Sequence, residues 1–303
     1  MEITPYEQWD GSIPALVSGM PNEAYHAHES ISKTGLDLIS RSPAHYRYAP
    51  PREPTRAMTI GSALDAGLLE PDLFREKYIN SGAKDRRASE YKQAVKSVGT
   101  DELVLTANEY AGIQTMIDSV WSDPTARAQL EMDAHRQLSV FAIDPETGVV
   151  VRCRFDLLSF TGGADGPGVA VDLKKTQDAR APAFERSIIN YRYYVQAPFY
   201  LDVLRWASGI QIDEFRFLAV EEKPPHGLKV YRMDDTAMAE GRRDYRADLD
   251  RYAECLESDE WPAYDTSEVD LIGLPEWRLR QIEGELDDAG IAYSDDERES
   301  SDE

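Results

Sequence analysis

The sequence predicts an α/β fold in which a mixed central β-sheet is flanked by helices. The first third of the chain carries apolar residues at helical spacing, and the spacing changes to strand-like alternation at Gln137. After that point the pattern predicts three strands, a long helical region, two more strands and a last helix. Helices interspersed with strands in this order are typical of a sheet covered by helices, and no repeat or long linker divides the sequence.

Start and stop signals define the helices of the first third. Ser, Thr and Asp side chains accept hydrogen bonds from the free N–H groups of a first helical turn, and proline fits the first position of a helix. The expected helices are a short one from Ser32 through Leu38 and Ile39, one that restarts at Ser42-Pro43, an apolar one over residues 60–69 that ends before Pro71, one from Thr106 to Trp121, and one that starts at Asp123-Pro124.

The predicted strands that follow carry polar side chains on one face. The segments LSVFAI and VVVRCRFDLL, joined by the turn DPETG, form a β-hairpin in which Asp156 shares a face with two arginines. A glycine-rich loop over residues 161–168 leads to the strand VAVDLKK, where Asp172 and Lys174 share a face. The alternation therefore places two carboxylates and one lysine on the polar faces of successive strands.

Helices and two more strands complete the second half. The long helical region spans roughly residues 181–206 and contains Pro198. Proline in a helix interior costs roughly 3 kcal/mol, so we expect a kink there or a new helix that starts near Ala197. The strands EFRFLAV and LKVYRM follow, and a final helix covers about residues 235–258.

Charge is the least typical property of the composition. The formal net charge is -23, whereas proteins that bind nucleic acid usually carry a basic footprint. A solvated acidic surface with a local basic groove is one interpretation, and an acidic protein with a basic partner, such as a DNA mimic, is the other. Much of the acidic excess lies between Glu283 and Glu303, and we expect the end of this tail to be disordered.

The composition also disfavours several protein classes. The two cysteines, Cys153 and Cys255, are too few for a disulfide framework or a four-thiolate metal cluster. No run of about 18 apolar residues suits a membrane span. The acidic N-terminal segment lacks the pattern of a secretory signal. We therefore expect a cytoplasmic protein that does not associate with a membrane.

Asp156, Asp172 and Lys174 are a candidate catalytic group. Two carboxylates on adjacent strands offer the oxygen ligands that Mg²⁺ prefers, with positions left for water and a phosphate. The lysine could hold or help deprotonate an attacking water and stabilise the charge that develops on the phosphorane. An Asp-x-Lys pair on a strand is more often an ordinary solvated ion pair, so the surrounding motifs have to decide between the two interpretations.

Seven motifs, in order along the chain, resemble one nuclease family. They are YHAHESISKTGLDLISRSPAHYRY at 25–48, IGSALDAGLLEP at 60–71, RCRFDLL at 152–158, VDLKKT at 171–176, AFERSIINYRYYVQAPFYLD at 183–202, FLAVEEKPP at 217–225 and WPAY at 261–264. Together they resemble the exonuclease VIII group, the RecE-like, DUF3799-type branch of the PD-(D/E)XK phage recombination nucleases. The resemblance covers most of the chain, from about residue 24 to about residue 264.

The resemblance implies a PD-(D/E)XK restriction-endonuclease-like core with a metal-dependent site. Asp156 and Asp172 match the family's metal-binding carboxylates, and Lys174 matches its catalytic lysine. Gln196 and Tyr200 match the Tyr-x-x-Gln-x-x-x-Tyr helix that closes the site. Because these two residues stand at i and i+4 on one helix face, packing of that face is the alternative interpretation.

Two positions depart from the family pattern. Asp65 stands where the family usually has a histidine that acts as a metal ligand, and an aspartate can replace it as an oxygen ligand for Mg²⁺. The alternative is that Asp65 is a surface residue and that the ligand is lost. Gln137 stands where the family often has a glutamate. An amide cannot act as a general base, so the sequence places Gln137 outside the catalytic set.

Basic side chains near the site and in one segment are the candidates for DNA contact. Residues 84–96 form the most basic stretch of the chain, for which a solvated loop and helix is the alternative. Contacts from such residues to phosphates supply affinity without sequence preference. The candidates are Lys84, Arg86, Arg87, Arg152, Arg154 and Lys175.

The resemblance also implies a function and partners. The expected activity is 5′→3′ degradation of double-stranded DNA ends with Mg²⁺, or Mn²⁺ in its place, to leave single-stranded tails for a RecT-like single-strand annealing protein. A homo-oligomeric ring around DNA is expected. The alternatives are a catalytically decayed nuclease fold or an acidic interaction protein, which the charge and Asp65 favour, and a RecB-like nuclease without an iron–sulfur cluster. We expect an N-terminal extension over 1–24, a single nuclease domain over 25–265, and a C-terminal helix and acidic tail over 266–303.

Overall fold

The computed structural model describes residues 2–51, 53–161, 168–212, 214–267, 269–276 and 278–282. The chain divides into two units, Met1–Ala263 and Tyr264–Glu303. The first unit contains every strand and helix discussed below. Most of the glycine-rich loop (162–167) and the acidic tail (283–303) lie outside the described residues.

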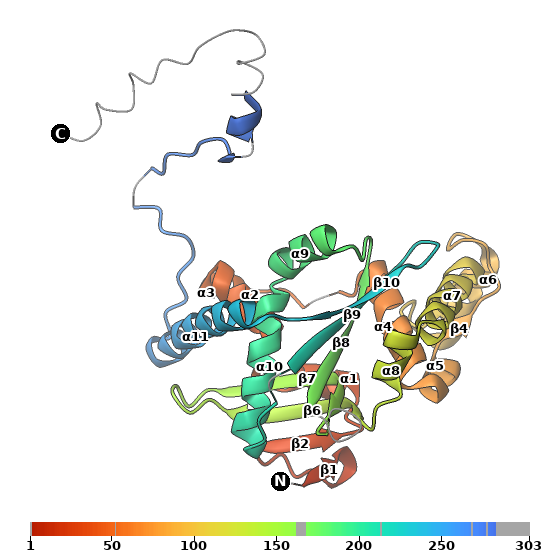
Figure 1. Cartoon of the computed structure of the whole chain (residues 1–303), viewed down its shortest axis with the longest axis horizontal. Helices are drawn as coiled ribbons and strands as arrows, with labels where there is room; N and C mark the ends of the chain where they lie inside the picture. Colours follow the sequence, from red (N-terminus) through yellow and green to blue (C-terminus); the bar gives the residue numbers. More distant parts are fainter. Residues whose placement is uncertain are drawn as a thin grey trace. The chain divides into compact units, whose positions relative to one another are not determined.

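The core of the first unit is a mixed eight-stranded sheet (Figure 1). The mixed sheet is as the sequence predicts, whereas the three of its strands that lie in the first 32 residues were not predicted. Its strands, in spatial order, are β1 (Ile3–Pro5), β2 (Ala15–Ser18), β6 (His135–Ile143), β7 (Val150–Ser159), β8 (Val169–Thr176), β9 (Glu214–Glu221) and β10 (Leu228–Arg232), and β3 (Ile31–Ser32) also pairs with β7. The pairs β1–β2, β3–β7 and β8–β9 are parallel, and the others are antiparallel. Residues 1–24 therefore contribute β1 and β2 to this sheet.

Helices cover both faces of the sheet. They are α1 (Asn22–Ala27), α2 (Lys33–Arg41), α3 (Pro43–Arg47), α4 (Arg56–Leu69), α5 (Pro71–Lys77), α6 (Ser89–Val98), α7 (Ala107–Ser122), α8 (Pro124–Leu130), α9 (Ala181–Asn190), α10 (Tyr193–Ser208) and α11 (Asp235–Ser258). A short sheet of β4 (Ile79–Asn80) and β5 (Val104–Leu105) lies beside α6 and α7. Within the described residues, no helix combines the length and apolar character that crossing a bilayer would require.

Two apolar clusters, one on each face, hold these layers together. On one face α2, α9, α10 and α11 bury side chains such as Leu36, Phe184 and Phe199 against the sheet. On the other face α4, α7 and α8 bury side chains such as Leu64 and Ile113. Figure 1 shows α10 and α4 on opposite sides of β8 and β9. Burial of apolar surface on both faces accounts for the strongly apolar sequences of β8 and β9.

The predicted helix starts are confirmed at three caps. Ser42 accepts a hydrogen bond from the His45 N–H at the start of α3, and Asp123 accepts one from Ala126 at the start of α8. Thr106 and Glu109 form a reciprocal capping box at the start of α7. These signals act within a few residues of each other, which explains why the sequence alone located them.

The alternative that a new helix starts near Ala197 is wrong. The long helical region is divided between α9 and α10 at Arg192, whose backbone is left-handed with φ 50°. Pro198 lies inside α10. Proline removes the hydrogen bond to the carbonyl of residue i−4, here Tyr194. That carbonyl points at Gly241 of α11, where an added Cβ would lie 1.8 Å from the oxygen. The missing side chain at this glycine lets α11 pack against the proline-containing turn.

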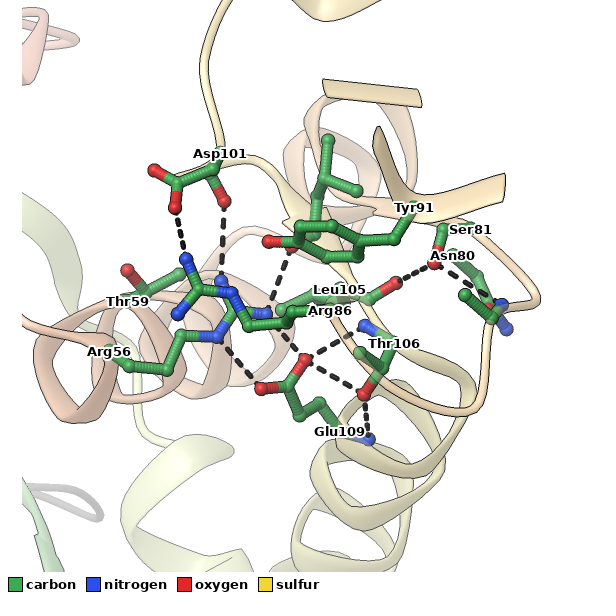
Figure 2. Close-up of polar contacts among 12 residues, drawn as sticks. Arg56, Thr59, Asn80, Ser81, Arg86, Tyr91, Asp101, Leu105, Thr106 and Glu109 are labelled. Atoms are coloured by element: carbon green, nitrogen blue, oxygen red, sulfur yellow. Dashed lines mark hydrogen bonds and ion pairs between the residues drawn. The ribbon is translucent and has the colours of Figure 1, made fainter. Parts of the chain in front are cut away.

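An ionic cluster joins α4 to the cap of α7 (Figure 2). Arg56 Nε donates a 2.8 Å hydrogen bond to Glu109, and the Thr106 N–H and hydroxyl each donate one of 2.8 Å to the same carboxylate. Burial raises the pKa of Glu109, but the hydrogen bonds from Arg56 and Thr106 outweigh it and lower the pKa from 4.5 to about 2.

Glu109→Gln is expected to lower the free energy of unfolding at pH 7 and to have a progressively smaller effect in acid. Because the pKa of Glu109 is depressed in the folded chain, its contribution is present above about pH 4.5 and is lost as the pH falls toward about 2. Urea denaturation of both proteins between pH 7 and pH 3 measures the difference. Glu76→Gln, at an exposed position of α5, is the matched control. An effect of Glu109→Gln that stays constant with pH would contradict the assignment.

Candidate active site

The candidate site lies where β7 changes its neighbour. Leu157 of β7 pairs with Val171 of β8, where the ladder between the two strands ends. Asp156 and Asp172 are the next residues on the two strands, and they lie within electrostatic range of each other. At its other end β7 pairs with β3 through Val151 and Arg152. The edge of β7 that faces away from β6 therefore pairs with β8 at one end and with β3 at the other, and Asp156 lies between the two paired segments. Strands that separate in this way leave room for side chains between them.

Asp156 is held by two donors at this separation. Its Oδ2 accepts a 2.8 Å hydrogen bond from the backbone N–H of Leu173, and its Oδ1 accepts one of 3.1 Å from Gln137 Nε2. Burial, followed by the charge of Asp172, raises the pKa of Asp156 to about 7, against the opposing effects of Lys174 and these two donors. The carboxyl group is thus positioned by its neighbours and has a strongly perturbed proton affinity.

Asp172 and Lys174 form an ion pair on the face of β8 that α10 covers. Only 5% of Asp172 is exposed, and its Oδ1 accepts a 2.5 Å hydrogen bond from Gln196 Nε2. The ammonium of Lys174 lies 4.5 Å from the centre of the Tyr193 ring. Burial lowers the pKa of Lys174, but Asp172, Tyr193 and Asp156 outweigh it and raise the pKa above its ordinary value. Lys174 therefore carries its proton at neutral pH.

Asp65 completes the acidic side of the site from the opposite layer. Helix α4 packs against β7 and β8 and brings Asp65 within electrostatic range of Asp156 and Asp172. Burial and these two negative charges raise the pKa of Asp65 well above its ordinary value, with Lys174 and Lys175 opposing. The sequence expectation that Asp65 belongs to the site is consistent with this placement, and its role as a ligand stays a prediction.

The side chains present fit a hard divalent cation by their chemistry. Three carboxylates share a partly buried site in which their negative charges repel one another, and carboxylate oxygens are the ligands that hard cations take. Among the described residues, however, three such side chains are not already gathered around one point. Two carboxylates instead face protein donors: Leu173 and Gln137 for Asp156, Gln196 and Lys174 for Asp172.

Gln196 and Tyr200, one turn apart on α10, have different surroundings. Gln196 is buried and contacts Asp172 directly. The ring of Tyr200 packs in an aromatic cluster, at 5.4 Å from Phe155 and 6.2 Å from Phe215. Burial raises the pKa of Tyr200 well above its ordinary value, with smaller contributions from Tyr25 and from the site carboxylates. The structure thus brings Gln196 into the site and supports packing as the role of the Tyr200 ring.

Arg152, Arg154 and Lys175, predicted to contact DNA, have protein partners. Arg152 is buried and donates a 2.7 Å hydrogen bond to the carbonyl of His28, and Arg154 donates one of 3.0 Å to Ser139. Both guanidinium groups also lie over the ring of Tyr25. The two arginines therefore hold α1 and the segment after it against β7. Lys175 forms an ion pair with Glu222.

The other predicted DNA contacts lie away from the trio. Lys84, Arg86 and Arg87 are exposed in the segment before α6, and Figure 1 shows α6 beyond α7, at a distance from β8. Arg86 forms an ion pair with Asp101 and lies over the ring of Tyr91, as Figure 2 shows. A surface hollow of about 360 Å³ is lined by Arg86, Arg87, Tyr91, Lys92, Val95 and Asp101. These residues form a separate basic surface.

Three residues near the site lie outside the set of site residues predicted from the sequence. Gln137 orients Asp156 and has a left-handed backbone with φ 50°. Tyr193 covers the ammonium of Lys174. Lys33 follows β3 and lies within electrostatic range of Lys174; burial lowers its pKa, while an ion pair with Asp37 opposes this. Two of them had a detectable signal: Gln137 stands at a position where the family often has glutamate, and Tyr193 is the first tyrosine of the Tyr-x-x-Gln-x-x-x-Tyr pattern.

Comparisons with known proteins bear on the family and the fold of the chain. A model of the family described as "PDDEXK-like domain of unknown function (DUF3799)" matches residues 40–272. Among solved structures, a "Putative exonuclease" from Eubacterium rectale is 13% identical with a TM-score of 0.57, over 86% of this chain and 97% of that chain. Another, SSO0001, is 16% identical with a TM-score of 0.27, over 62% of this chain and 85% of that chain, which is too low to carry an argument. No curated protein matches the sequence.

The family match and the structural match support the same fold. At 13% identity the Eubacterium rectale structure shows a shared fold and nothing further. The family model extends from α2 to beyond α11 and includes Asp65, Asp156, Asp172, Lys174 and Gln196. The predicted PD-(D/E)XK core is therefore confirmed, and the chain belongs to the DUF3799 family of PDDEXK-like domains.

Proposed function

We propose that this protein is a divalent-cation-dependent nuclease that degrades linear duplex DNA from its ends. The observation that carries the proposal is the placement of Asp156 and Asp172 where the β7–β8 ladder ends, with Lys174 paired to Asp172, inside a PDDEXK-like domain. Packing alone does not require two carboxylates and a lysine at a half-buried position, because burying charge is costly. Sites with strongly perturbed carboxyl groups are frequently catalytic.

Each residue of the site has a distinct task in this proposal. Asp156, Asp172 and Asp65 would hold the cation, which supplies Lewis acidity for phosphodiester hydrolysis when bound. Lys174, kept next to Asp172 and the Tyr193 ring, donates hydrogen bonds to the attacking water or to the phosphate oxygens. Gln196 and Gln137 orient the two strand carboxylates through their amide groups.

The finer parts of the proposal rest on the family resemblance. We propose Mg²⁺, or Mn²⁺ in its place, as the cation, and 5′→3′ polarity with single-stranded tails as the product. The resemblance is also the reason to propose an exonuclease rather than an endonuclease, and the Eubacterium rectale protein of similar fold is named a "Putative exonuclease". We propose a RecT-like annealing protein as the partner and a homo-oligomeric ring as the assembly. With a net charge of -23, contacts to phosphates must be local.

The purified protein is expected to degrade linear duplex DNA in the presence of Mg²⁺ and to leave covalently closed circular DNA intact. Chelation of the cation is expected to abolish the activity, and restored Mg²⁺ or Mn²⁺ to recover it, because carboxylates alone cannot activate water for attack on a phosphodiester. The release of nucleotides from substrates labelled at the 5′ or the 3′ end measures both rate and polarity. Reactions at low and high salt determine the contribution of phosphate contacts.

A Lys174→Ala protein, purified in the same way, tests whether the degradation depends on the proposed site. Cleavage of closed circles at the same rate as linear DNA would replace the exonuclease assignment with an endonuclease. The nuclease assignment would fail if the wild-type protein degraded no DNA with either cation at any salt concentration.

A further inference from the structure

An exposed tyrosine lies at the surface end of an aromatic stack that leads to Lys174. Tyr191 is 61% exposed in the short link between α9 and α10. Its ring stacks on that of Tyr193, with centres 5.5 Å apart and planes at 27°. Tyr193 stacks in turn on Phe217 of β9 at 5.6 Å, and the ammonium of Lys174 lies 4.5 Å from the Tyr193 ring. Tyr191 is therefore separated from Lys174 by a single ring.

The link that carries Tyr191 is held by two helices, α2 and α11. Arg192 has a left-handed backbone, a conformation that persists in a non-glycine residue only when its surroundings impose it. Its guanidinium group binds Asp37 of α2 at 3.2 Å and Asp248 of α11 at 2.7 Å. Lys33 of α2 donates a hydrogen bond to the carbonyl of Tyr191 and pairs with Asp37. The backbone at Tyr191 is thus fixed although its ring is exposed.

An exposed and fixed aromatic ring next to the site suits stacking with a nucleobase. Base–aromatic stacking accepts any base, because every base has a π-face, and it requires no positive charge. This matters in a chain of net charge -23, in which Arg152, Arg154 and Lys175 near the site are engaged by protein partners. Ile189, in the last turn of α9 just before this link, is also exposed.

We infer that Tyr191 stacks against a base next to the scissile phosphate and thereby positions the strand that is cut beside Lys174. The inference rests on the proposed nuclease function and adds a substrate-positioning residue to it. Tyr191 lies outside the Tyr193–Gln196–Tyr200 pattern of α10, so the family motif does not assign it a role. Because Tyr191 stacks on Tyr193 and Tyr193 contacts Lys174, a base stacked on Tyr191 is held close to the lysine.

The experiment compares four substitutions at position 191 in the full-length protein with Mg²⁺ and linear duplex DNA. Tyr191→Phe and Tyr191→Trp keep a stacking ring, Tyr191→Leu keeps apolar cover over Tyr193 without stacking, and Tyr191→Ala removes both. We expect KM for DNA to rise roughly 5- to 150-fold in the Leu and Ala proteins and to stay near the wild-type value in the Phe and Trp proteins. Tyr48→Ala, at a tyrosine that is 76% exposed after α3, is the matched control and should leave KM unchanged.

A second measurement does not depend on cleavage. DNA with 5-iododeoxyuridine at the terminal nucleotides crosslinks under light to aromatic rings stacked on it, and mass spectrometry of the protein bound to this DNA in Ca²⁺ identifies the residue. We expect the crosslink at Tyr191 in the wild-type protein and its loss in Tyr191→Ala. If the wild-type protein binds DNA without degrading it, the nuclease proposal fails while a crosslink at Tyr191 still supports stacking.

Three results would overturn the inference. The first is full activity of Tyr191→Leu, which would show that Tyr191 only covers Tyr193. The second is equal KM values for the Ala and Phe proteins. The third is bound DNA that does not crosslink at Tyr191, or no DNA binding by the wild-type protein at all.

Discussion

Replacing Lys174 by alanine is expected to lower the rate of DNA hydrolysis by about 100- to 1000-fold, the usual cost of removing one preorganised donor from a site where charge develops. The ammonium of Lys174 is held between Asp172 and the Tyr193 ring, so it meets the phosphate without having to reorganise. Its loss should act on kcat, because the interaction strengthens as charge grows on the phosphate. Steady-state kinetics with end-labelled linear duplex DNA measures the effect.

Lys229→Ala is the matched control for this substitution. Lys229 is an exposed lysine of β10, and its removal should change kcat by less than twofold. Circular dichroism must show that the Lys174→Ala protein is folded, since the substitution leaves the buried carboxylate of Asp172 without its cation. Equal rates for the wild-type and Lys174→Ala proteins would show that Lys174 is not a catalytic residue.

Replacing Gly241 by alanine is expected to lower the free energy of unfolding by about 3 kcal/mol or more, at the upper end of the usual cost of overpacking. An added Cβ would lie 1.8 Å from the carbonyl oxygen of Tyr194, 2.6 Å from its carbonyl carbon and 3.0 Å from Pro198. The first two atoms belong to the backbone of α10 and cannot rotate away. Helices α10 and α11 would have to separate, at the expense of the core that both bury. Urea denaturation measures the loss.

Gly112→Ala is the matched control, because Gly112 is also inside a helix but an added Cβ there meets nothing within 4 Å. Alanine has the higher helix propensity, so this substitution should stabilise the protein by about 0.5–1 kcal/mol. If Gly241→Ala were as stable as the wild-type protein, the close contact between α10 and α11 would be wrong.

Local signals explain why much of the fold could be predicted. The capping box at Thr106 and Glu109 and the cap at Asp123 act between neighbours in the chain, and they marked the starts of α7 and α8 correctly. Alternation of polar and apolar residues likewise predicted the hairpin of β6 and β7 and the short β8.

The break in the long helical region could not be predicted in this way. Proline usually interrupts a helix, yet Pro198 lies within α10 because the carbonyl that it deprives of a donor packs against Gly241, 43 residues later in the chain. The break occurs instead at Arg192, whose left-handed backbone is held by Asp37 and Asp248 from two other helices. Both outcomes depend on contacts that a local pattern does not contain.

In the site, too, local patterns predicted some residues, while contacts between distant segments could not be predicted. The alternation along β7 and β8, together with the family motifs, was enough to select Asp156, Asp172 and Lys174, because residues two apart on a strand share a face. The same reasoning proposed Arg152 and Arg154 as DNA contacts, but the structure engages them with His28, Ser139 and Tyr25. Alternation predicts which face of a strand a side chain lies on, but not whether another part of the chain covers that face.

The sequence by itself therefore determined the mixed sheet flanked by helices and the strand faces, since these follow from short-range periodicity and capping. It predicted the central trio only together with the family motifs. Only the tertiary structure decided that Gln137 supports Asp156, that Gln196 contacts Asp172, that α4 brings Asp65 to the same site, and that a stack of tyrosines reaches Lys174 from the surface. These contacts join segments far apart in the chain, and they form because burial of both sheet faces packs the helices against β7 and β8.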